Sequence, residues 1–331
     1  MEKRSLKDYF LLSAKGVAMG AADVVPGVSG GTIAFITGIY EELLTSIANI
    51  NLEALQTLKK EGVAAFWKHI NGTFFVFLLM GIFISIASLA NLIQYLLSEW
   101  AIPTWSFFFG LIVASVLVVF PKIKNRKRWS IWVALAAGTI VAYFITLATP
   151  TQGTDSLLYL FLCGSIAIIA MILPGISGSF ILLLMGAYLT VMQTISSFVG
   201  ALRQFSTELL IAHGTPLVVF ALGCITGLLL FSRILKWMFQ RAHDITVAVL
   251  TGFLIGSLNK VWPWKKTLES FVKHPGTEKE KVVPLIEQNV LPHEYTAITG
   301  EPNYMLIAIV TAAIGFILVY GLNKFAPKSD V

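Results

Sequence analysis

Charged residues are scarce in this chain. Only 13% of its 331 residues are Asp, Glu, Lys or Arg, whereas soluble domains average about 25%. Hydrophobic residues make up 56% of the chain, and its mean hydropathy is +0.79. These values exclude an ordinary soluble domain and predict an integral membrane protein. The net charge of +6 is therefore interpreted as membrane topology, and no nucleic-acid partner is expected.

Residues that build catalytic or metal sites are also few. The two cysteines, Cys163 and Cys224, lie in apolar segments and are expected to be small buried side chains rather than a disulfide or metal pair. None of the five histidines forms a His-x-x-x-His or Cys/His metal pattern. No Gly-Lys-Ser or Gly-Lys-Thr follows a glycine run, so ATP hydrolysis within this chain is not expected. We expect no catalytic residue, no metal and no cofactor.

A proline-glycine motif occurs twice. Residues 26–30 read Pro-Gly-Val-Ser-Gly, and residues 174–178 read Pro-Gly-Ile-Ser-Gly, at a shift of 148. The match continues at this shift and then at a shift of 142, and the paired residues include Gly16 and Gly164, Gly38 and Gly186, Tyr40 and Tyr188, Gly81 and Gly223, Gly110 and Gly252, and Pro121 and Pro263. Repeated helix breaks in an apolar chain are typical of transporters built from two related halves. We place the halves at residues 1–150 and 151–331.

The apolar segments predict an all-α membrane protein. Six stretches are expected to be spanning helices, at about 73–97, 105–120, 130–148, 215–232, 245–259 and 303–321. Shorter stretches flank each motif, at about 10–25 and 32–47 and at 157–173 and 179–198. Each pair is interpreted as a re-entrant hairpin, 10–47 and 157–198, although both arms could instead cross fully. Three or five crossings per half are both odd, so the halves are expected to be inverted relative to each other.

The placement of basic residues orients the chain. The loop between the second and third stretches is strongly basic and is expected to be cytoplasmic; it contains Lys122, Lys124, Arg126, Lys127 and Arg128. Counting crossings outward then puts both termini inside, in a multi-pass protein of the bacterial cytoplasmic membrane. The polar segment 260–302 is expected to be an extracytoplasmic insertion in the second half, with room for a short amphipathic helix.

Small and hydroxyl-bearing residues surround each motif and suggest an anion cradle. These residues are Ser29, Gly30, Gly31, Thr32, Ser177, Gly178 and Ser179. Glycine lets an anion approach backbone N–H groups at a helix start, and hydroxyls add donors. The alternative is close helix packing, which small residues also permit. For the glycines the two interpretations stay open, and for the hydroxyls we favour ligand contact.

Charged residues in apolar segments are the second sign of a site, because charges are expensive there. Lys15 and Asp23 lie before the first motif, and either form an ion pair or take part in function. Glu41 and Glu42 follow it, and with Asp23 they are candidates for proton or ion coupling. Arg203 and Arg233 complete the candidate phosphate-binding cations. We take Lys15 as the first choice, Arg233 as the second, and Arg203 as the residue that recruits substrate at the outer leaflet.

The motifs resemble those of a known family. The residues concerned are Lys15-Gly16, the run 19–32 (MGAADVVPGVSGGT), the run 170–179 (AMILPGISGS), the run 250–258 (LTGFLIGSL) and Trp262-Pro263-Trp264. In these runs the chain is similar to the bacterial PopT-type polyprenyl-phosphate transporter family, long known only as a domain of unknown function. The resemblance covers about residues 8–322. It implies translocation of undecaprenyl phosphate from the outer to the inner leaflet, for reuse in cell-envelope synthesis.

Two other functions remain open beside this one. The first is an ion-coupled transporter of a small soluble anion, which needs a polar pathway. The second is a membrane enzyme acting on a lipid phosphate, which needs a nucleophile or metal set that the sequence lacks. The expected partners are thus a polyprenyl phosphate lipid and the bilayer, with proton or sodium coupling open. The sequence does not give the oligomeric state.

Overall fold

The computed structural model of the chain describes residues 4–25, 28–151, 153–154, 156–204, 207–273 and 281–325. Most of these residues are helical. The helices are α1 (Leu6–Asp23), α2 (Gly30–Ile36), α3 (Tyr40–Ala48), α4 (Leu52–Glu61), α5 (Val63–His69), α6 (Gly72–Glu99), α7 (Ala101–Val119), α8 (Trp129–Leu147), α9 (Leu157–Ile172), α10 (Gly178–Leu184), α11 (Tyr188–Gln204), α12 (Thr207–Ser257), α13 (Pro292–Thr299) and α14 (Met305–Phe325). A short 3₁₀ turn, η1 (Phe120–Lys122), follows α7, and two strands, β1 (Lys265–Lys273) and β2 (Lys281–Asn289), precede α13.

Long apolar helices confirm a multi-pass membrane protein. Within the described ranges four helices are long and apolar enough to cross a bilayer, namely α6, α7 with η1, α8 and α12, or five if the bent pair α10–α11 counts as one span. Their outer faces expose large apolar side chains, such as Phe83 on α6 and Phe144 on α8. Such faces are stable against lipid tails and would be costly in water.

The helix α12 contains two of the expected spans. Its 51 residues are interrupted at Ala242, whose φ of −146° and ψ of 54° are not helical. The expected segments 215–232 and 245–259 lie on either side of this kink. The six expected spans thus fall on α6, α7, α8, the two parts of α12, and α14.

The segments around the motifs are broken more often than expected. The stretch 32–47 was expected to be one helix, but α2 ends before Gly38, whose φ is 76°, and α3 begins at Tyr40. The stretch 179–198 is divided in the same way at Gly186, with φ 65°, and α10 and α11 meet at 108°. A positive φ at glycine is a common way to end a helix. The matched pair Gly38 and Gly186 is therefore a second pair of breaks.

Close helix contacts recur at the two sequence shifts. A Cβ atom added at Gly16 would lie 2.3 Å from the carbonyl oxygen of Leu78, so α1 packs tightly on α6. The same atom at Gly164 would lie 2.4 Å from the carbonyl oxygen of Phe220, between α9 and α12. Gly164 follows Gly16 by 148 residues, and Phe220 follows Leu78 by 142. The two halves thus build the same helix pair from matching positions.

Another repeated contact joins one half to the other. A Cβ atom at Gly110 on α7 would lie 1.9 Å from the carbonyl oxygen of Ala312 on α14. At Gly252, the position matched to Gly110, it would lie 2.3 Å from the carbonyl oxygen of Leu135 on α8. Helix α7 therefore pairs with α14, and the second part of α12 pairs with α8.

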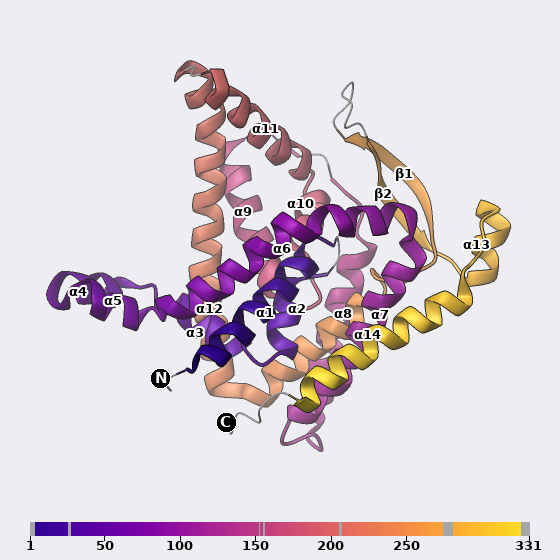
Figure 1. Cartoon of the computed structure of the whole chain (residues 1–331), viewed down its shortest axis with the longest axis horizontal. Helices are drawn as coiled ribbons and strands as arrows, with labels where there is room; N and C mark the ends of the chain where they lie inside the picture. Colours follow the sequence, from indigo (N-terminus) through magenta and orange to yellow (C-terminus); the bar gives the residue numbers. More distant parts are fainter. Residues whose placement is uncertain are drawn as a thin grey trace.

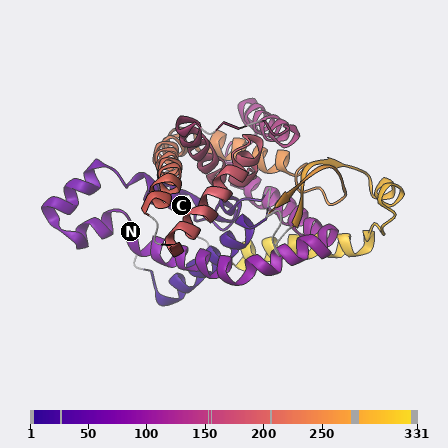
Figure 2. The same ribbon diagram turned by 90° about the horizontal axis from the view of Figure 1, so that it is seen from above.

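The segment 260–302 folds into a β-hairpin followed by a helix. Strands β1 and β2 are antiparallel, with Lys265 opposite Asn289 and Lys273 opposite Lys281. The short helix that the sequence allowed is α13, whereas the hairpin was not expected. Figure 1 shows the hairpin at the upper right, and the start of α1, the end of α14 and the turn between α7 and α8 along the lower side. Seen from above, α4 and α5 extend to one side of the helix bundle, and the hairpin and α13 to the other (Figure 2).

Candidate functional site

The first break, between α1 and α2, is closed by a carboxylate from its own half. Oδ1 of Asp23 accepts a hydrogen bond from the backbone N–H of Gly30 at 2.6 Å. The side chain of Ser29 caps α2 by accepting from the N–H of Gly31 at 3.0 Å. Pro26 and Gly27, which open the first motif, lie outside the described residues. The carboxylate of Asp23 thus occupies the start of α2, where the sequence predicted an anionic ligand.

The second break, between α9 and α10, has no carboxylate at the matched position. Met171 stands where the first half has Asp23. The hydroxyl groups of Ser177 and Ser179 lie 2.9 Å apart and bond to each other. At this break the polar groups are therefore neutral hydroxyls and backbone.

The two breaks touch each other at the centre of the bundle. The hydroxyl of Ser29 donates to the carbonyl oxygen of Met171 at 2.5 Å, and the N–H of Gly175 donates to Oγ1 of Thr32 at 2.9 Å. Ser29 and Thr32 are almost completely buried. Two hydroxyls at the first break therefore satisfy two backbone groups at the second break. The structure brings the residues of the predicted cradle into one region.

Two glycines of the predicted cradle are closely packed. A Cβ atom at Gly31 would lie 2.2 Å from the carbonyl oxygen of Ile172, and one at Gly30 would lie 2.5 Å from Oδ2 of Asp23. At Gly31 the neighbour is backbone, so only glycine fits there, whereas at Gly30 it is the end of a side chain that can turn aside. The close contact supports the packing interpretation for Gly31 and leaves both interpretations open for Gly30.

Lys15 and Asp23 are held at opposite ends of α2. The ammonium group of Lys15 donates to the carbonyl oxygen of Thr37, at the C-terminal end, at 2.9 Å. Asp23 bonds the N-terminal end of the same helix. The structure therefore joins these side chains through α2 rather than as a direct ion pair.

The other predicted charges gather around α3. Both oxygens of Glu42 are bonded by the guanidinium group of Arg4. Oε1 of Glu41 lies 3.3 Å from Nε2 of His243. Arg233 reaches the carbonyl oxygen of Ile50, just beyond α3, at 3.3 Å. The side chain of Arg203, on α11, lies outside the described part of the structure.

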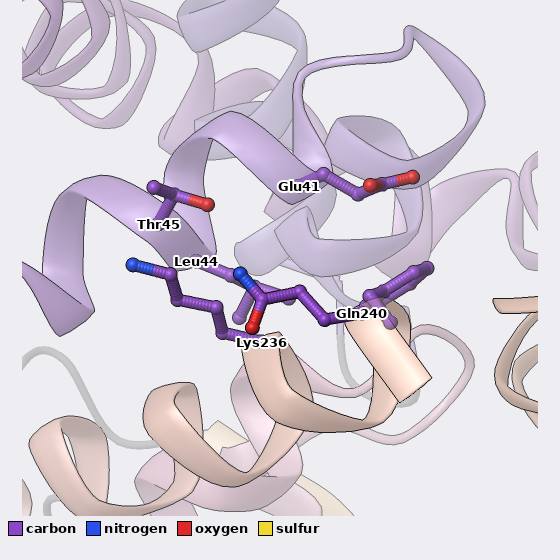
Figure 3. A pocket seen from close by; sticks show the side chains of 6 residues that line it. Glu41, Leu44, Thr45, Lys236 and Gln240 are labelled. Carbon is purple, nitrogen blue, oxygen red and sulfur yellow. The ribbon is translucent and has the colours of Figure 1, made fainter. Parts of the chain in front are cut away.

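A pocket of about 220 Å³ opens between α3 and α12. Figure 3 shows Lys236 and Gln240 from α12 facing Glu41 and Thr45 from α3. The ammonium group of Lys236 also donates to Oδ1 of Asn49 at 3.2 Å. Lys236 is not among the candidate site residues predicted from the sequence. Its spacing of four from Gln240, like that of Glu41 from Thr45, could have indicated two polar helix faces.

Comparison with known proteins identifies related sequences. Residues 19–279 match the model of the VCA0040-like family, described as undecaprenyl phosphate translocase-like. A protein of Vibrio cholerae named polyprenyl-phosphate transporter is 47% identical over 322 residues, which cover 97% of this chain and 98% of the relative. Another protein of that name, from Staphylococcus aureus, is 37% identical over 261 residues, which cover 75% of this chain and 84% of the relative. No solved structure matches.

Proposed function

The chain belongs to the undecaprenyl phosphate translocase-like family, and from this premise we propose that it carries undecaprenyl phosphate across the bacterial cytoplasmic membrane. Its curated relatives are named as polyprenyl-phosphate transporters. The proposed direction is from the outer to the inner leaflet, which returns the carrier lipid for another round of cell-envelope synthesis.

The proposed architecture is an inverted repeat of residues 1–150 and 151–331. Each half has one re-entrant hairpin, 10–47 or 157–198, and three spanning helices, and both termini are cytoplasmic. The glycine contacts that recur at the two shifts support the repeat, and the 108° bend between α10 and α11 supports re-entry. The basic turn after α7 lies along the same side as the start of α1 and the end of α14 (Figure 1). This supports the proposed orientation, because basic loops are usually cytoplasmic.

The observation that carries the proposed site is the contact between the two breaks. Hydroxyls of the first break meet backbone groups of the second break there, and lipid could not satisfy these backbone groups. We propose that the phosphate passes between the breaks and is bonded in turn by Ser29, Gly30, Gly31, Thr32, Ser177, Gly178 and Ser179. Asp23 then has to release the N–H of Gly30, and protonation of its carboxylate would favour that release. Asp23 is therefore our first candidate for coupling to a proton, ahead of Glu41 and Glu42.

Basic side chains balance the phosphate on either side of the breaks. We propose that Lys15 and Arg233 receive it on the cytoplasmic side, where the pocket between α3 and α12 offers a way out. Arg203 remains the proposed recruiting residue in the outer leaflet. A phosphate without such partners would cost several kcal/mol at mid-membrane depth.

The direct test is a proteoliposome assay. Undecaprenyl phosphate is placed in both leaflets, and its disappearance from the outer leaflet is followed with and without a proton or sodium gradient. We expect loss from the outer leaflet only when the protein is present, with acceleration by the coupled gradient. Inorganic phosphate at the same concentration as the lipid should leave the rate of lipid movement within about twofold, since the lipid binds more tightly and enters from the bilayer. Uptake of inorganic phosphate instead, with no lipid movement, would identify a soluble-anion transporter.

A further inference from the structure

Two lysines share one carboxylate at the base of the β-hairpin. The ammonium group of Lys260 lies 3.4 Å from Oε2 of Glu287, and that of Lys265 lies 3.3 Å from the same oxygen. The side chains of Lys260, Lys265 and Glu287 are only 17%, 6% and 19% exposed. We call these three residues the hairpin cluster. It contains one more positive charge than negative charge in a place that water hardly reaches.

Burial opposes the excess positive charge of the hairpin cluster. Burial lowers the pKa of Lys265 to about 8, even though the carboxylate of Glu287 beside it acts in the opposite direction. Burial alone would raise the pKa of Glu287, but the two lysines bring it below its usual range. At neutral pH the cluster therefore carries about one net positive charge. One carboxylate shared by two lysines leaves one positive charge unbalanced in a largely buried place, which is unfavourable, so the cluster suits a further anion.

The cluster lies beside the second break. Nζ of Lys260 sits 4.5 Å from the centre of the Phe180 ring, and Phe180 belongs to α10, next to Ser179. Nζ of Lys265 sits 3.7 Å from the centre of the Trp105 ring on α7. The cluster thus joins the hairpin to α7 and α10. An anion held there would be close to the second break, where Met171 stands in place of the aspartate of the first break.

We propose that the hairpin cluster is a docking site for the phosphate group of the lipid, on the membrane face that carries the hairpin. This inference rests on the proposed transport of a polyprenyl phosphate. The phosphate takes the place of Glu287 on Lys260, the more exposed of the two lysines, while Glu287 keeps its contact with Lys265. Glu287 is then a built-in competitor, which occupies Lys260 until substrate arrives and rebinds it when the phosphate moves on to the second break.

Binding to the purified full-length protein in detergent tests this site. Calorimetric titrations use geranyl phosphate, a short prenyl monophosphate, as the probe. We expect Lys260→Gln to weaken binding about tenfold or more, since a charged hydrogen bond is worth about 1.5–3 kcal/mol. Lys260→Arg should bind within about threefold of the wild type. Lys266→Gln is the matched control, because Lys266 follows Lys265 on β1 but is exposed, and should change affinity less than about twofold.

Glu287→Gln gives a result of the opposite sign. Removing the competitor should tighten binding of geranyl phosphate about threefold or more, whereas a carboxylate that only holds the hairpin together would weaken it when lost. Wild-type affinity in Lys260→Gln, or weaker binding in Glu287→Gln, would overturn the docking site.

Inorganic phosphate is the second arm of the titration. A lipid head-group site should bind geranyl phosphate about tenfold more tightly than inorganic phosphate, because the prenyl chain buries apolar surface. Equal affinities would assign the cluster to free phosphate and overturn the lipid assignment. The proteoliposome assay separates the two proposals. No lipid movement by the wild type contradicts the transport function, whereas normal transport together with unchanged binding in Lys260→Gln contradicts the docking site alone.

Discussion

The two helix breaks share a motif but differ in charge. At the first, Asp23 bonds the N–H of Gly30. At the second, the matched residue is Met171, and the hydroxyls of Ser177 and Ser179 bond each other. The two breaks thus share their motif residues, while the position of Asp23 and Met171 decides whether a carboxylate is present. Two breaks with the same motif can therefore serve unlike steps.

The breaks also differ in the space they leave. Gly31 admits no Cβ atom, because the carbonyl oxygen of Ile172 would be 2.2 Å away. The matched residue in the second half is Ser179, which carries a side chain. The backbone of the second half therefore presses on the first break, and the reverse contact leaves room for a hydroxyl.

The largest effect is expected from exchanging these two residues. Gly31→Ser should lower stability by about 3 kcal/mol, because the new Cβ atom would overlap a backbone oxygen that cannot move alone. Ser179→Gly should cost less than about 1 kcal/mol, since it removes one hydroxyl pair and adds flexibility. The measurement is the melting temperature of each purified variant in detergent. Equal losses of stability in the two variants would show that the two breaks are packed equally tightly.

The next effect concerns the carboxylate. Asp23→Met makes the first break resemble the second and leaves the buried N–H of Gly30 without its partner, at a cost of about 2 kcal/mol. Asp23→Asn keeps an acceptor oxygen and should melt close to the wild type. If Asp23 couples transport to protons, both variants should lose the acceleration by a pH gradient in proteoliposomes. A gradient response that survives in Asp23→Asn would limit Asp23 to a structural role.

A smaller effect is expected at the bonds between the halves. Thr32→Val removes the acceptor for the N–H of Gly175 and should cost about 1 kcal/mol. Ser177→Ala removes one member of the hydroxyl pair and should cost about half as much, because Ser179 can turn to another acceptor. Melting temperatures again compare the two. A larger loss of stability for Ser177→Ala would mean that the hydroxyl pair of the second break contributes more to stability than the bond between the two breaks.

The smallest effect is a pH dependence of phosphate binding at the hairpin cluster, which lies beside the second break. Lys265 faces Glu287 and Lys260, and burial puts its pKa at about 8. Raising the pH from about 7 to about 9 discharges Lys265, while a phosphate monoester with a second pKa of about 6 stays doubly charged. Affinity for geranyl phosphate should therefore fall about threefold over this range.

The control for that dependence is Lys265→Arg, because arginine keeps its charge throughout. Its affinity should be nearly flat over the same range. The same slope in both proteins would place the titrating group elsewhere, and a flat wild-type profile would show that the charge of Lys265 does not affect phosphate binding.

The sequence predicted the spans because hydropathy acts locally. Each expected apolar stretch lies on a helix, and the resemblance to the transporter family is confirmed by the comparisons. The division of the second arms at Gly38 and Gly186 was missed, although the two glycines had been paired, since a glycine alone does not say that its φ is positive. The β-hairpin was missed because the segment 260–302, taken as a whole, is polar and contains five prolines, and it was expected to be an insertion with at most a short helix.

The site was less predictable, because it depends on contacts between residues far apart in the chain. The bond from Ser29 to the carbonyl oxygen of Met171 spans 142 residues, and no local pattern indicates it. Lys15 was expected near the anion, but the turn at Gly38 brings Thr37 to it, at the other end of α2. Lys260 and Lys265 escaped notice because charges in a polar segment do not stand out as they do in an apolar one.

The pairing of α7 with α14 bears on how the chain is made. Gly110 on α7 packs against the backbone of Ala312, and a ribosome adds the 201 residues between them at about 5–20 per second. For at least about ten seconds, the face of α7 that carries Gly110 is therefore without α14. The first half therefore cannot finish folding on its own. Its assembly is a late step, completed when the last helix leaves the translocon.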